Sequence, residues 1–319
     1  MIDESSKSEE AGKLKTNRWH SLKLVHTQEN ITSVNYFTSE GISYRVSTLN
    51  SSFETDYHIN LEKLKKRETV FLINGLTRCK EHWIGFDEWL ATDVNVISID
   101  PRGIGESRLA ADWNHSVEDI VDDVQSVVKS LELSRIHLVG FSLGGMVALS
   151  YAMKHQNELS SLIVINSSIG GGVRALRLTP RSAFALLTAG LSSDNLIHTK
   201  LSKLLLAQNI TQKAREKAVS TWINIDSRFG RGYATAIKQL FAAFKFRNPK
   251  VLESVNVPTL VVCGKKDKFV PPINSKIICD YIPKSKLVTF EKGGHELHMD
   301  SRDKLKKRII DHVKANMNR

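Results

Sequence analysis

Short apolar runs separated by polar, glycine or proline residues recur along most of the chain. Each run has the length of a buried strand and is rich in β-branched residues. The pattern predicts strands over residues 31–37, 42–49, 69–73, 94–99, 136–139, 162–165, 259–263 and 287–290. The first two are close enough in sequence to pair as an antiparallel start of a sheet.

Helical patterns separate several of these runs. Ser116 is a suitable N-cap with Asp119 three residues later, and apolar residues from Val117 to Leu131 then follow one helical face. Strands that alternate with helices favour a parallel sheet that is covered on both faces. The sequence therefore predicts an α/β fold with a mostly parallel central sheet of about eight strands flanked by helices.

The strand pattern stops after Ile165 and resumes at Pro258. In the segment between them, runs with helical spacing predict helices over residues 183–191, 196–206, 211–226 and 233–246. Several large apolar residues of this segment are candidates to face a pocket or the junction with the sheet: Leu186, Leu187, Leu191, Leu204, Leu205, Trp222, Phe241 and Phe244.

The composition is that of an ordinary globular protein, with 41% hydrophobic and 25% charged residues in a chain of 319. Its three cysteines form neither an even set nor a metal-binding spacing, which favours a reduced, intracellular protein. No apolar stretch is long enough to span a membrane, and residues 1–28 lack the apolar core of a secretory signal. We therefore expect a flexible polar N-terminal arm over residues 1–28 and a cytoplasmic location.

Positive charge is concentrated in the helical segment. Residues 170–250 hold 14 of the 45 Lys and Arg residues but only 3 of the 34 Asp and Glu residues, so the remainder of the chain is neutral. Such a surface can attract an anionic substrate or a membrane surface, or it can simply be the solvated face of amphipathic helices. Nucleic acid is not an expected partner, because no aromatic stacking set accompanies the basic residues.

The most informative motif is Gly140-Phe141-Ser142-Leu143-Gly144, which lies between a predicted strand and a helix-forming run. A serine at the apex of such a turn has its hydroxyl exposed, and glycines beside it avoid clashes in the strained backbone. The N–H group of Leu143, at the start of the helix, then points toward the group that the hydroxyl attacks. Ser142 is therefore a candidate nucleophile.

A serine nucleophile needs a histidine base, which in turn needs an orienting carboxylate. Asp267 follows one predicted strand, and His295 follows the next strand after a pair of glycines. Ser142, Asp267 and His295 therefore come just after three strand ends, at the rim where open α/β sheets bind ligands. Position 166, the common alternative place for the acid, holds an asparagine followed by two serines.

Three other polar residues leave alternatives open. His298 is a rival base, but it lacks the preceding glycines and begins a helix-like run. His82 either lines the entrance of the site or packs beside Trp83, and the packed position is favoured. Arg78 is a candidate contact for a substrate carboxylate, although an ordinary surface position is favoured.

Taken together, the chain resembles the α/β-hydrolase superfamily. The order serine, acid, histidine is that of the family, and residues 100–107 resemble its D-x-R-G-x-G-x-S turn. Asn74-Gly75-Leu76-Thr77 stands where the family has its first oxyanion loop, with Asn74 in place of a frequent histidine. The resemblance implies that the N–H groups of Leu76 and Leu143 form the oxyanion hole.

The same resemblance implies a domain organisation and a reaction. Residues 29–169 and 251–319 would form the α/β-hydrolase core, and residues 170–250 a helical cap over the active site. The expected function is hydrolysis of a small-molecule carboxylic ester through an acyl-enzyme, with no metal and no organic cofactor. C–C bond hydrolysis, perhydrolysis or acyl transfer would use the same triad, and a non-catalytic binding protein is a further alternative.

Overall fold

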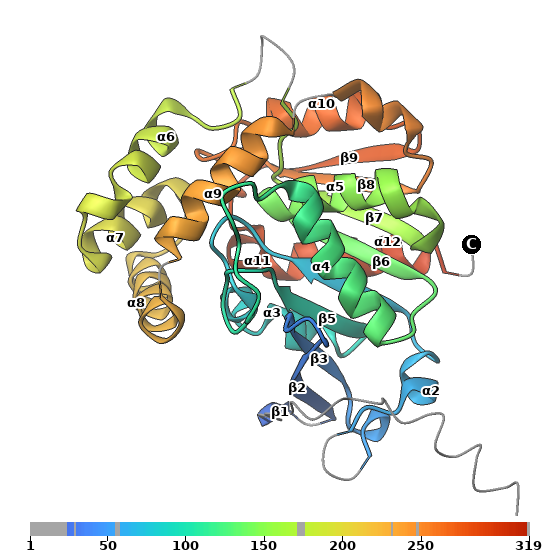
Figure 1. Ribbon diagram of the computed structural model, residues 1–319. Helices are drawn as coiled ribbons and strands as arrows, with labels where there is room; N and C mark the ends of the chain where they lie inside the picture. Colours follow the sequence, from blue (N-terminus) through green and yellow to red (C-terminus); the bar gives the residue numbers. More distant parts are fainter. Residues whose placement is uncertain are drawn as a thin grey trace, which may run out of the picture.

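A nine-stranded sheet with the order β1-β2-β3-β5-β4-β6-β7-β8-β9 forms the centre of the protein in a computed structural model (Figure 1). The structure describes residues 24–28, 30–54, 58–170, 176–230, 232–246 and 249–317. The strands are β1 (Leu24–Gln28), β2 (Ile31–Phe37), β3 (Ser43–Leu49), β4 (Thr69–Ile73), β5 (Asn95–Asp100), β6 (Ile136–Phe141), β7 (Leu159–Ile165), β8 (Thr259–Gly264) and β9 (Ser285–Phe290).

The strand directions follow the predicted pattern. Strands β1, β2 and β3 form an antiparallel start that pairs with β5, and every pair from β5 through β4 to β9 is parallel. All eight predicted strands are present, within a few residues of their expected bounds. The expectation for residues 1–28 is wrong at Leu24–Gln28, because these residues form β1 and pair with β2. Residues 1–23 lie outside the described residues.

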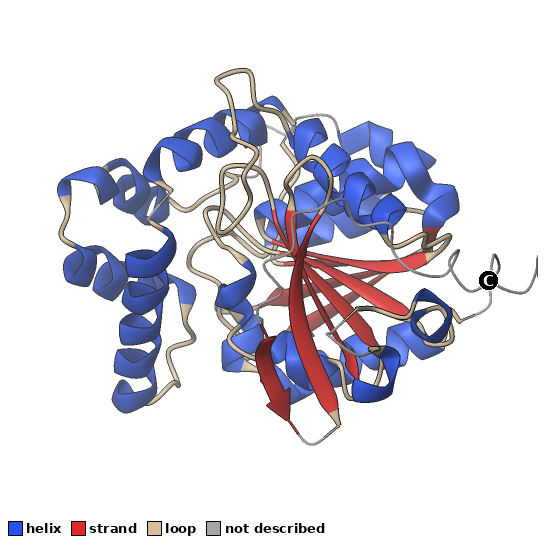
Figure 2. Cartoon of the chain, turned by 60° about the horizontal axis from the view of Figure 1, so that its bottom comes forward, coloured by secondary structure: helices blue, strands red, loops and turns tan. Residues whose placement is uncertain are grey.

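Helices cover both faces of the sheet (Figure 2). Those of the core are α2 (Leu61–Leu64), α3 (Phe86–Leu90), α4 (Val117–Ser130), α5 (Leu143–His155), α10 (Ile273–Tyr281), α11 (Leu297–Asp300) and α12 (Arg302–Lys314). Short 3-10 turns are η2 (Asn50–Ser52), η4 (Lys80–Trp83), η5 (Gln156–Glu158) and η7 (Pro249–Ser254). Helix α4 begins with the predicted capping box, in which Ser116 and Asp119 bond each other's backbone N–H groups.

Alternate residues of the strands belong to different hydrophobic clusters. On β4, Phe71 and Ile73 pack with α4 and α5, whereas Val70 and Leu72 pack with α3 and α12. This is the expected result of a two-residue repeat in a sheet that is buried on both sides. The two clusters hold the strands in register and thereby fix where their carboxyl ends lie.

The chain between β7 and β8 forms a separate group of helices, which we call the helical insertion and define as residues 176–246. It contains α6 (Pro180–Leu187), η6 (Ala189–Leu191), α7 (Asp194–Leu205), α8 (Gln212–Phe229) and α9 (Tyr233–Lys245). Figure 1 shows α6, α7 and α8 projecting to one side of the sheet, with α9 between them and the core. Among the helices that the structure describes, none combines the length and apolar character needed to cross a membrane.

Candidate active site

Ser142 occupies the sharp turn between β6 and α5. Its backbone has φ 55° and ψ −117°, a conformation that an L-residue adopts only under constraint. A Cβ atom on Gly140 would lie 2.2 Å from the carbonyl oxygen of Gly144, and one on Gly144 would lie 2.2 Å from that of Ile73. Because strand and helix approach this closely, only glycine fits on either side of the turn, and the serine is held at its apex.

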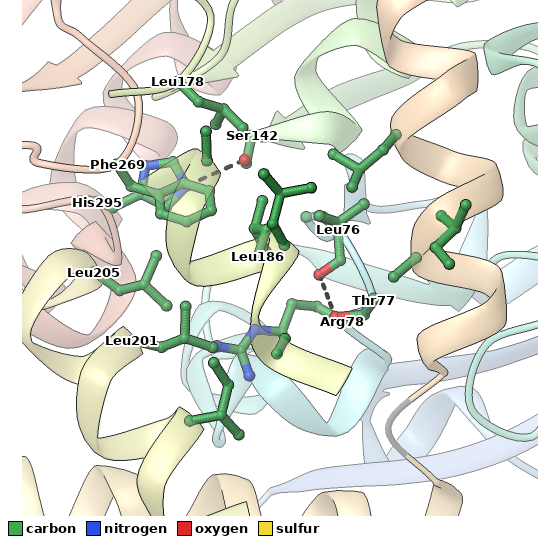
Figure 3. A pocket seen from close by; sticks show the side chains of 18 of the residues that line it. Leu76, Thr77, Arg78, Ser142, Leu178, Leu186, Leu201, Leu205, Phe269 and His295 are labelled. Atoms are coloured by element: carbon green, nitrogen blue, oxygen red, sulfur yellow. Dashed lines mark hydrogen bonds between the residues drawn. The ribbon is translucent and has the colours of Figure 1, made fainter. Parts of the chain in front are cut away.

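The structure brings together the three residues that the sequence predicts as catalytic. His295 Nε2 lies 3.1 Å from Ser142 Oγ, and His295 Nδ1 lies 2.7 Å from Asp267 Oδ2. All three side chains are buried, and the ring of His295 packs between those of Phe141 and Phe269. Figure 3 shows the hydrogen bond between Ser142 and His295 at one end of a cavity.

Asp267 is well placed to select one tautomer of His295. Its Oδ1 accepts hydrogen bonds from the N–H groups of Phe269 and Val270, which orient the carboxylate. Its Oδ2 then accepts the Nδ1 proton of His295, so the lone pair of Nε2 faces the Ser142 hydroxyl. In this arrangement the imidazole can accept the serine proton.

Asn166 stands where an alternative catalytic acid would be placed, and it connects the loop that carries His295 to the sheet. Its amide nitrogen donates to the carbonyl oxygens of Gly294 and His295, and its Oδ1 accepts from the N–H group of Gly264. Asn166 has φ 46°, a left-handed conformation that asparagine tolerates better than most residues. An asparagine directly after a buried strand was the only signal in the sequence for this role.

The loop after β4 lies against the Ser142 turn. Asn74 stabilises this loop at both ends, since its Oδ1 accepts from Gly75 N–H and its Nδ2 donates to the Cys79 carbonyl. Leu76, Ser142 and Leu143 line one small cavity of about 50 Å³. Within the described ranges, neither the Leu76 nor the Leu143 N–H group donates a hydrogen bond to the protein. Both are therefore available to a bound oxygen.

A larger cavity of about 520 Å³ lies between the core and the helical insertion, next to Ser142 and His295. Its walls are mainly apolar, and the insertion supplies much of them: Leu178, Leu186, Leu187, Leu201, Leu205, Leu240, Phe241 and Phe244. Five of the eight predicted apolar residues line it. Leu204 and Trp222 pack instead in a cluster with Phe269 and Val270, at the junction with the core that the sequence also allows for them. Leu191 points to solvent at 91% exposure.

The cavity also holds an ion pair that the sequence did not predict. Arg78 lines the cavity (Figure 3). Its guanidinium lies over the ring of Trp222, and its Nη2 is 3.4 Å from Glu296 Oε1. The expected surface position of Arg78 is therefore wrong. Because an arginine with only 10% of its side chain exposed needs partners for its charge, Glu296 and Trp222 together explain its position.

The two remaining histidine candidates are packed inside the protein. His298 Nε2 donates to the His82 carbonyl, and its ring contacts Trp83 and Phe141. Burial lowers the pKa of His298, and burial together with Arg78 holds that of His82 well below its usual range. His82 is absent from the wall of the large cavity, as the favoured interpretation predicted. His295, and not His298, contacts Ser142.

No cluster of three or more His, Cys, Asp or Glu side chains that could hold a metal ion occurs in the ranges that the structure describes. A serine, a histidine oriented by a carboxylate, and free N–H groups beside the serine form the arrangement used for attack on a carbonyl carbon.

A family model described as alpha/beta hydrolase fold matches residues 68–301. The chain belongs to this family. Its sequence relatives are named for different reactions. A Bacillus subtilis (strain 168) protein described provisionally as a 2-succinyl-6-hydroxy-2,4-cyclohexadiene-1-carboxylate synthase is 24% identical over 290 residues, which cover 84% of this chain and 93% of that protein. A proline iminopeptidase of Pestalotiopsis fici is 26% identical over 242 residues, 70% of this chain and 83% of that protein.

Solved structures agree with this assignment at the level of the fold. The 2-hydroxy-6-oxo-6-phenylhexa-2,4-dienoate hydrolase of Rhodococcus sp. strain RHA1 superposes with a TM-score of 0.72 at 16% identity, over 89% of this chain and 99% of that one. The named reactions of these α/β hydrolases differ in the bond that is formed or broken. The reaction of this chain must therefore be argued from its own site.

Proposed function

We propose that this α/β hydrolase cleaves a carboxylic ester through an acyl-enzyme on Ser142. The observation that carries the proposal is the hydrogen-bonded chain from Asp267 through His295 to Ser142, which opens on a mainly apolar cavity. An ester is the simplest acyl substrate for these groups, because it presents a carbonyl carbon to the serine and releases an alcohol that the histidine can protonate.

Each residue has a defined role in the proposed reaction. Ser142 Oγ attacks the ester carbonyl while His295 Nε2 takes the serine proton, and Asp267 stabilises the resulting imidazolium. The Leu76 and Leu143 N–H groups bind the oxyanion, each donor contributing about 3–4 kcal/mol in transition-state stabilisation. His295 then gives its proton to the leaving alcohol. In the second half, His295 activates a water that releases the acid from Ser142.

The helical insertion would act as the cap in this scheme, with the core in residues 29–169 and 251–319 and the cap in residues 170–250. Its leucine and phenylalanine side chains form much of the cavity wall, so they would bind the apolar part of the substrate and limit the access of water. The cavity volume of about 520 Å³ supports short to medium acyl groups. The cytoplasmic location expected from the sequence stays a prediction.

The anionic-substrate preference suggested by the charge distribution stays a prediction as well. Inside the cavity, the guanidinium of Arg78 is already paired with Glu296, so a substrate carboxylate would have to compete with that carboxylate. Most of the remaining basic side chains of the insertion are on its outer surface. Their effect on a small anionic ester would be one of long-range attraction, which salt screens over about 8 Å at physiological ionic strength.

A fluorophosphonate probe combined with an ester series tests the proposal. We expect covalent labelling at Ser142, located by peptide mass spectrometry, and hydrolysis of nitrophenyl esters that is lost by orders of magnitude in Ser142→Ala. Ser220→Ala, which removes an exposed hydroxyl on α8, is the matched control and should retain labelling and activity.

The same series separates the alternatives. One outcome is that Ser142 is labelled while the esters are not hydrolysed. Turnover of a carbamate, of a diketone by C–C bond cleavage, or of an acyl-transfer substrate would then assign that chemistry to the same triad. An unlabelled protein without ester hydrolysis would favour the binding-protein alternative. Ester hydrolysis that survives Ser142→Ala would exclude Ser142 as the nucleophile.

A further inference from the structure

The helical insertion carries large apolar side chains on surfaces that face solvent. Phe184 is 66% exposed, Leu187 77%, Leu191 91% and Phe241 58%. We call these four residues the apolar rim. On a surface helix the solvent-facing positions are normally polar, so exposed apolar residues grouped in one region indicate an interaction surface.

The two helices that bear the rim bury small or polar residues and expose some of their largest apolar ones. On α6, Ser182 is fully buried and its hydroxyl donates to the Lys268 carbonyl, while Phe184 and Leu187 face outward. On α9, Gln239 is buried against the core, whereas Phe241 is exposed. On both helices a polar side chain bonds to the core, while large apolar side chains remain exposed to solvent.

The rim borders the mouth of the active-site cavity. Leu187 of α6 and Phe241 of α9 both line this cavity and are both more than half exposed, so they lie where it meets solvent. Phe184 and Leu191 are three and four residues from Leu187 on either side, which places them on the same face of α6 and η6. Figure 1 shows α6 at the upper edge of the insertion, above α7 and α8.

Basic side chains share the faces that carry exposed apolar residues. The same spacing of three or four residues, which places side chains next to each other on a helix, occurs on three helices: Arg181 with Phe184 on α6, Leu196 with Lys200 on α7, and Phe241 with Lys245 on α9. In the described part of the insertion, seven exposed side chains are basic and one, Glu216, is acidic. The seven are Arg181, Lys200, Lys203, Lys213, Lys217, Arg228 and Lys245.

We propose that the apolar rim and the basic side chains around it bind the surface of an anionic lipid bilayer, so that the mouth of the active-site cavity opens toward the lipid. Apolar side chains that enter the acyl boundary, flanked by Lys and Arg at the headgroup level, are the arrangement that holds a helix at a membrane surface. Each basic residue near an anionic surface adds to the attraction, which salt weakens.

Charge distinguishes this partner from a second copy of the chain. Pairing two rims face to face would bring two strongly positive surfaces together, which opposes association. An anionic bilayer supplies the opposite charge and an apolar layer at the same time. Binding at a bilayer surface does not depend on which bond Ser142 attacks.

Vesicle co-sedimentation tests the proposal, with the full chain and with its Ser142→Ala variant. We expect binding to vesicles of equal parts phosphatidylcholine and phosphatidylglycerol, weak binding to phosphatidylcholine alone, and a decline as salt is raised. The double variant Phe184→Ser with Leu191→Ser should reduce binding by about tenfold or more, because two large apolar side chains no longer enter the lipid. Neither residue lines the cavity, so its hydrolysis of a soluble ester should equal that of the unmodified chain.

Two further variants make the test specific. Leu287→Ser removes an exposed leucine of β9, outside the insertion, and should bind vesicles as the unmodified chain does. Arg181→Glu with Lys245→Glu should remove the preference for phosphatidylglycerol. The proposal would be overturned by no binding to either vesicle, by equal binding of the rim variant, or by a dimer in sedimentation velocity that the rim variant converts to a monomer. The last result would assign the rim to a second copy.

Discussion

The main-chain N–H group of His295 donates a 2.7 Å hydrogen bond to the carbonyl oxygen of Leu205. Leu205 is the last residue of α7, so the helical insertion is bonded directly to the backbone of the histidine that faces Ser142. The N–H group of Glu296 donates to the same carbonyl. A displacement of α7 would therefore move the imidazole, and the position of the insertion is part of the geometry of the triad.

Asp300 reinforces this junction from the other side. Its Oδ2 accepts hydrogen bonds from the N–H groups of Gly294 and Ala207, one in the histidine loop and one just beyond α7. Asp300→Ala removes the acceptor of both groups. We expect kcat to fall by about 10- to 100-fold with little change in KM, because His295 is displaced while the substrate cavity is retained. Steady-state kinetics on a soluble ester measure this effect.

Asp300→Asn is the matched control, because its amide oxygen can still accept both hydrogen bonds. It should retain most of the activity. If Asp300→Ala kept the kcat of the unmodified chain while its thermal midpoint fell, Asp300 would have a structural role alone.

The raised pKa of Asp300 predicts that the stability of the protein depends on pH. Burial raises its pKa to about 7, although hydrogen bonds from Ala207 and Gly294 oppose the shift. Between about pH 4 and pH 7 the folded protein therefore keeps a proton that the unfolded chain has released, so the contribution of Asp300 to stability falls as pH rises. Asparagine has no such proton. The unfolding free energies of Asp300→Asn and of the unmodified chain are measured by urea titration. The value for the variant should increase relative to that of the unmodified chain from pH 4 to pH 7. Parallel pH curves would show that Asp300 is ionised throughout.

The residues that the sequence located correctly are those fixed by local constraints. The turn around Ser142 is specified by glycines two residues away, and the positions of Asp267 and His295 follow from the strands that precede them. The four helices of the insertion were found because their apolar residues repeat with helical spacing. Such signals extend over a few residues and do not depend on the rest of the fold.

The residues that the sequence misplaced depend on contacts between distant segments. Arg78 is largely removed from solvent because Glu296 and Trp222, from two other parts of the chain, contact its side chain. Asn166 acts through groups about 100 residues further along the chain. Strand β1 has mixed polar and apolar residues, so no hydrophobic alternation marks it, and its pairing with β2 defines it. Composition and spacing carry none of this information.

Lys80 is fully buried, although lysine is normally a surface residue. Its ammonium group is fully buried, 2.6 Å from Asp100 Oδ2 and 2.9 Å from Glu106 Oε2. Burial alone would lower the pKa of Lys80, but the two carboxylates outweigh it and hold the pKa above its usual value. Lys80→Met would leave Asp100 charged and unpaired in the interior, and we expect a loss of about 3–5 kcal/mol in unfolding free energy.

Lys65 provides the comparison for this measurement. It forms a 3.2 Å pair with Glu132 at the surface. Lys65→Met should change the unfolding free energy by less than about 0.5 kcal/mol, because exposed pairs are solvated and screened. Denaturant titration of both variants checks the contrast, and equal losses would contradict the assigned importance of the buried pair.

Helix α9 of the insertion also contacts the loop that we propose as half of the oxyanion hole. The N–H group of Thr77 donates a 2.9 Å hydrogen bond to Oε1 of the buried Gln239, and Thr77 has the left-handed value φ 59°. Thr77 follows Leu76 directly. Gln239 therefore holds the strained residue that fixes the direction of the Leu76 N–H group, and we expect it to position this donor without touching the substrate.

Gln239→Met keeps the length of the side chain but removes the acceptor, so the Thr77 N–H group loses its partner and the loop can relax. We expect kcat to fall by about 10- to 100-fold with KM nearly constant, since loss of one complete oxyanion donor costs about 100- to 1,000-fold. Lys238→Met is the matched comparison, because it removes a neighbouring bond between α9 and the core, from Lys238 Nζ to the Ala111 carbonyl. It should lower the thermal midpoint as Gln239→Met does, but it should leave kcat unchanged. Equal kcat values in the two variants would show that α9 supports the fold alone and has no part in placing Leu76.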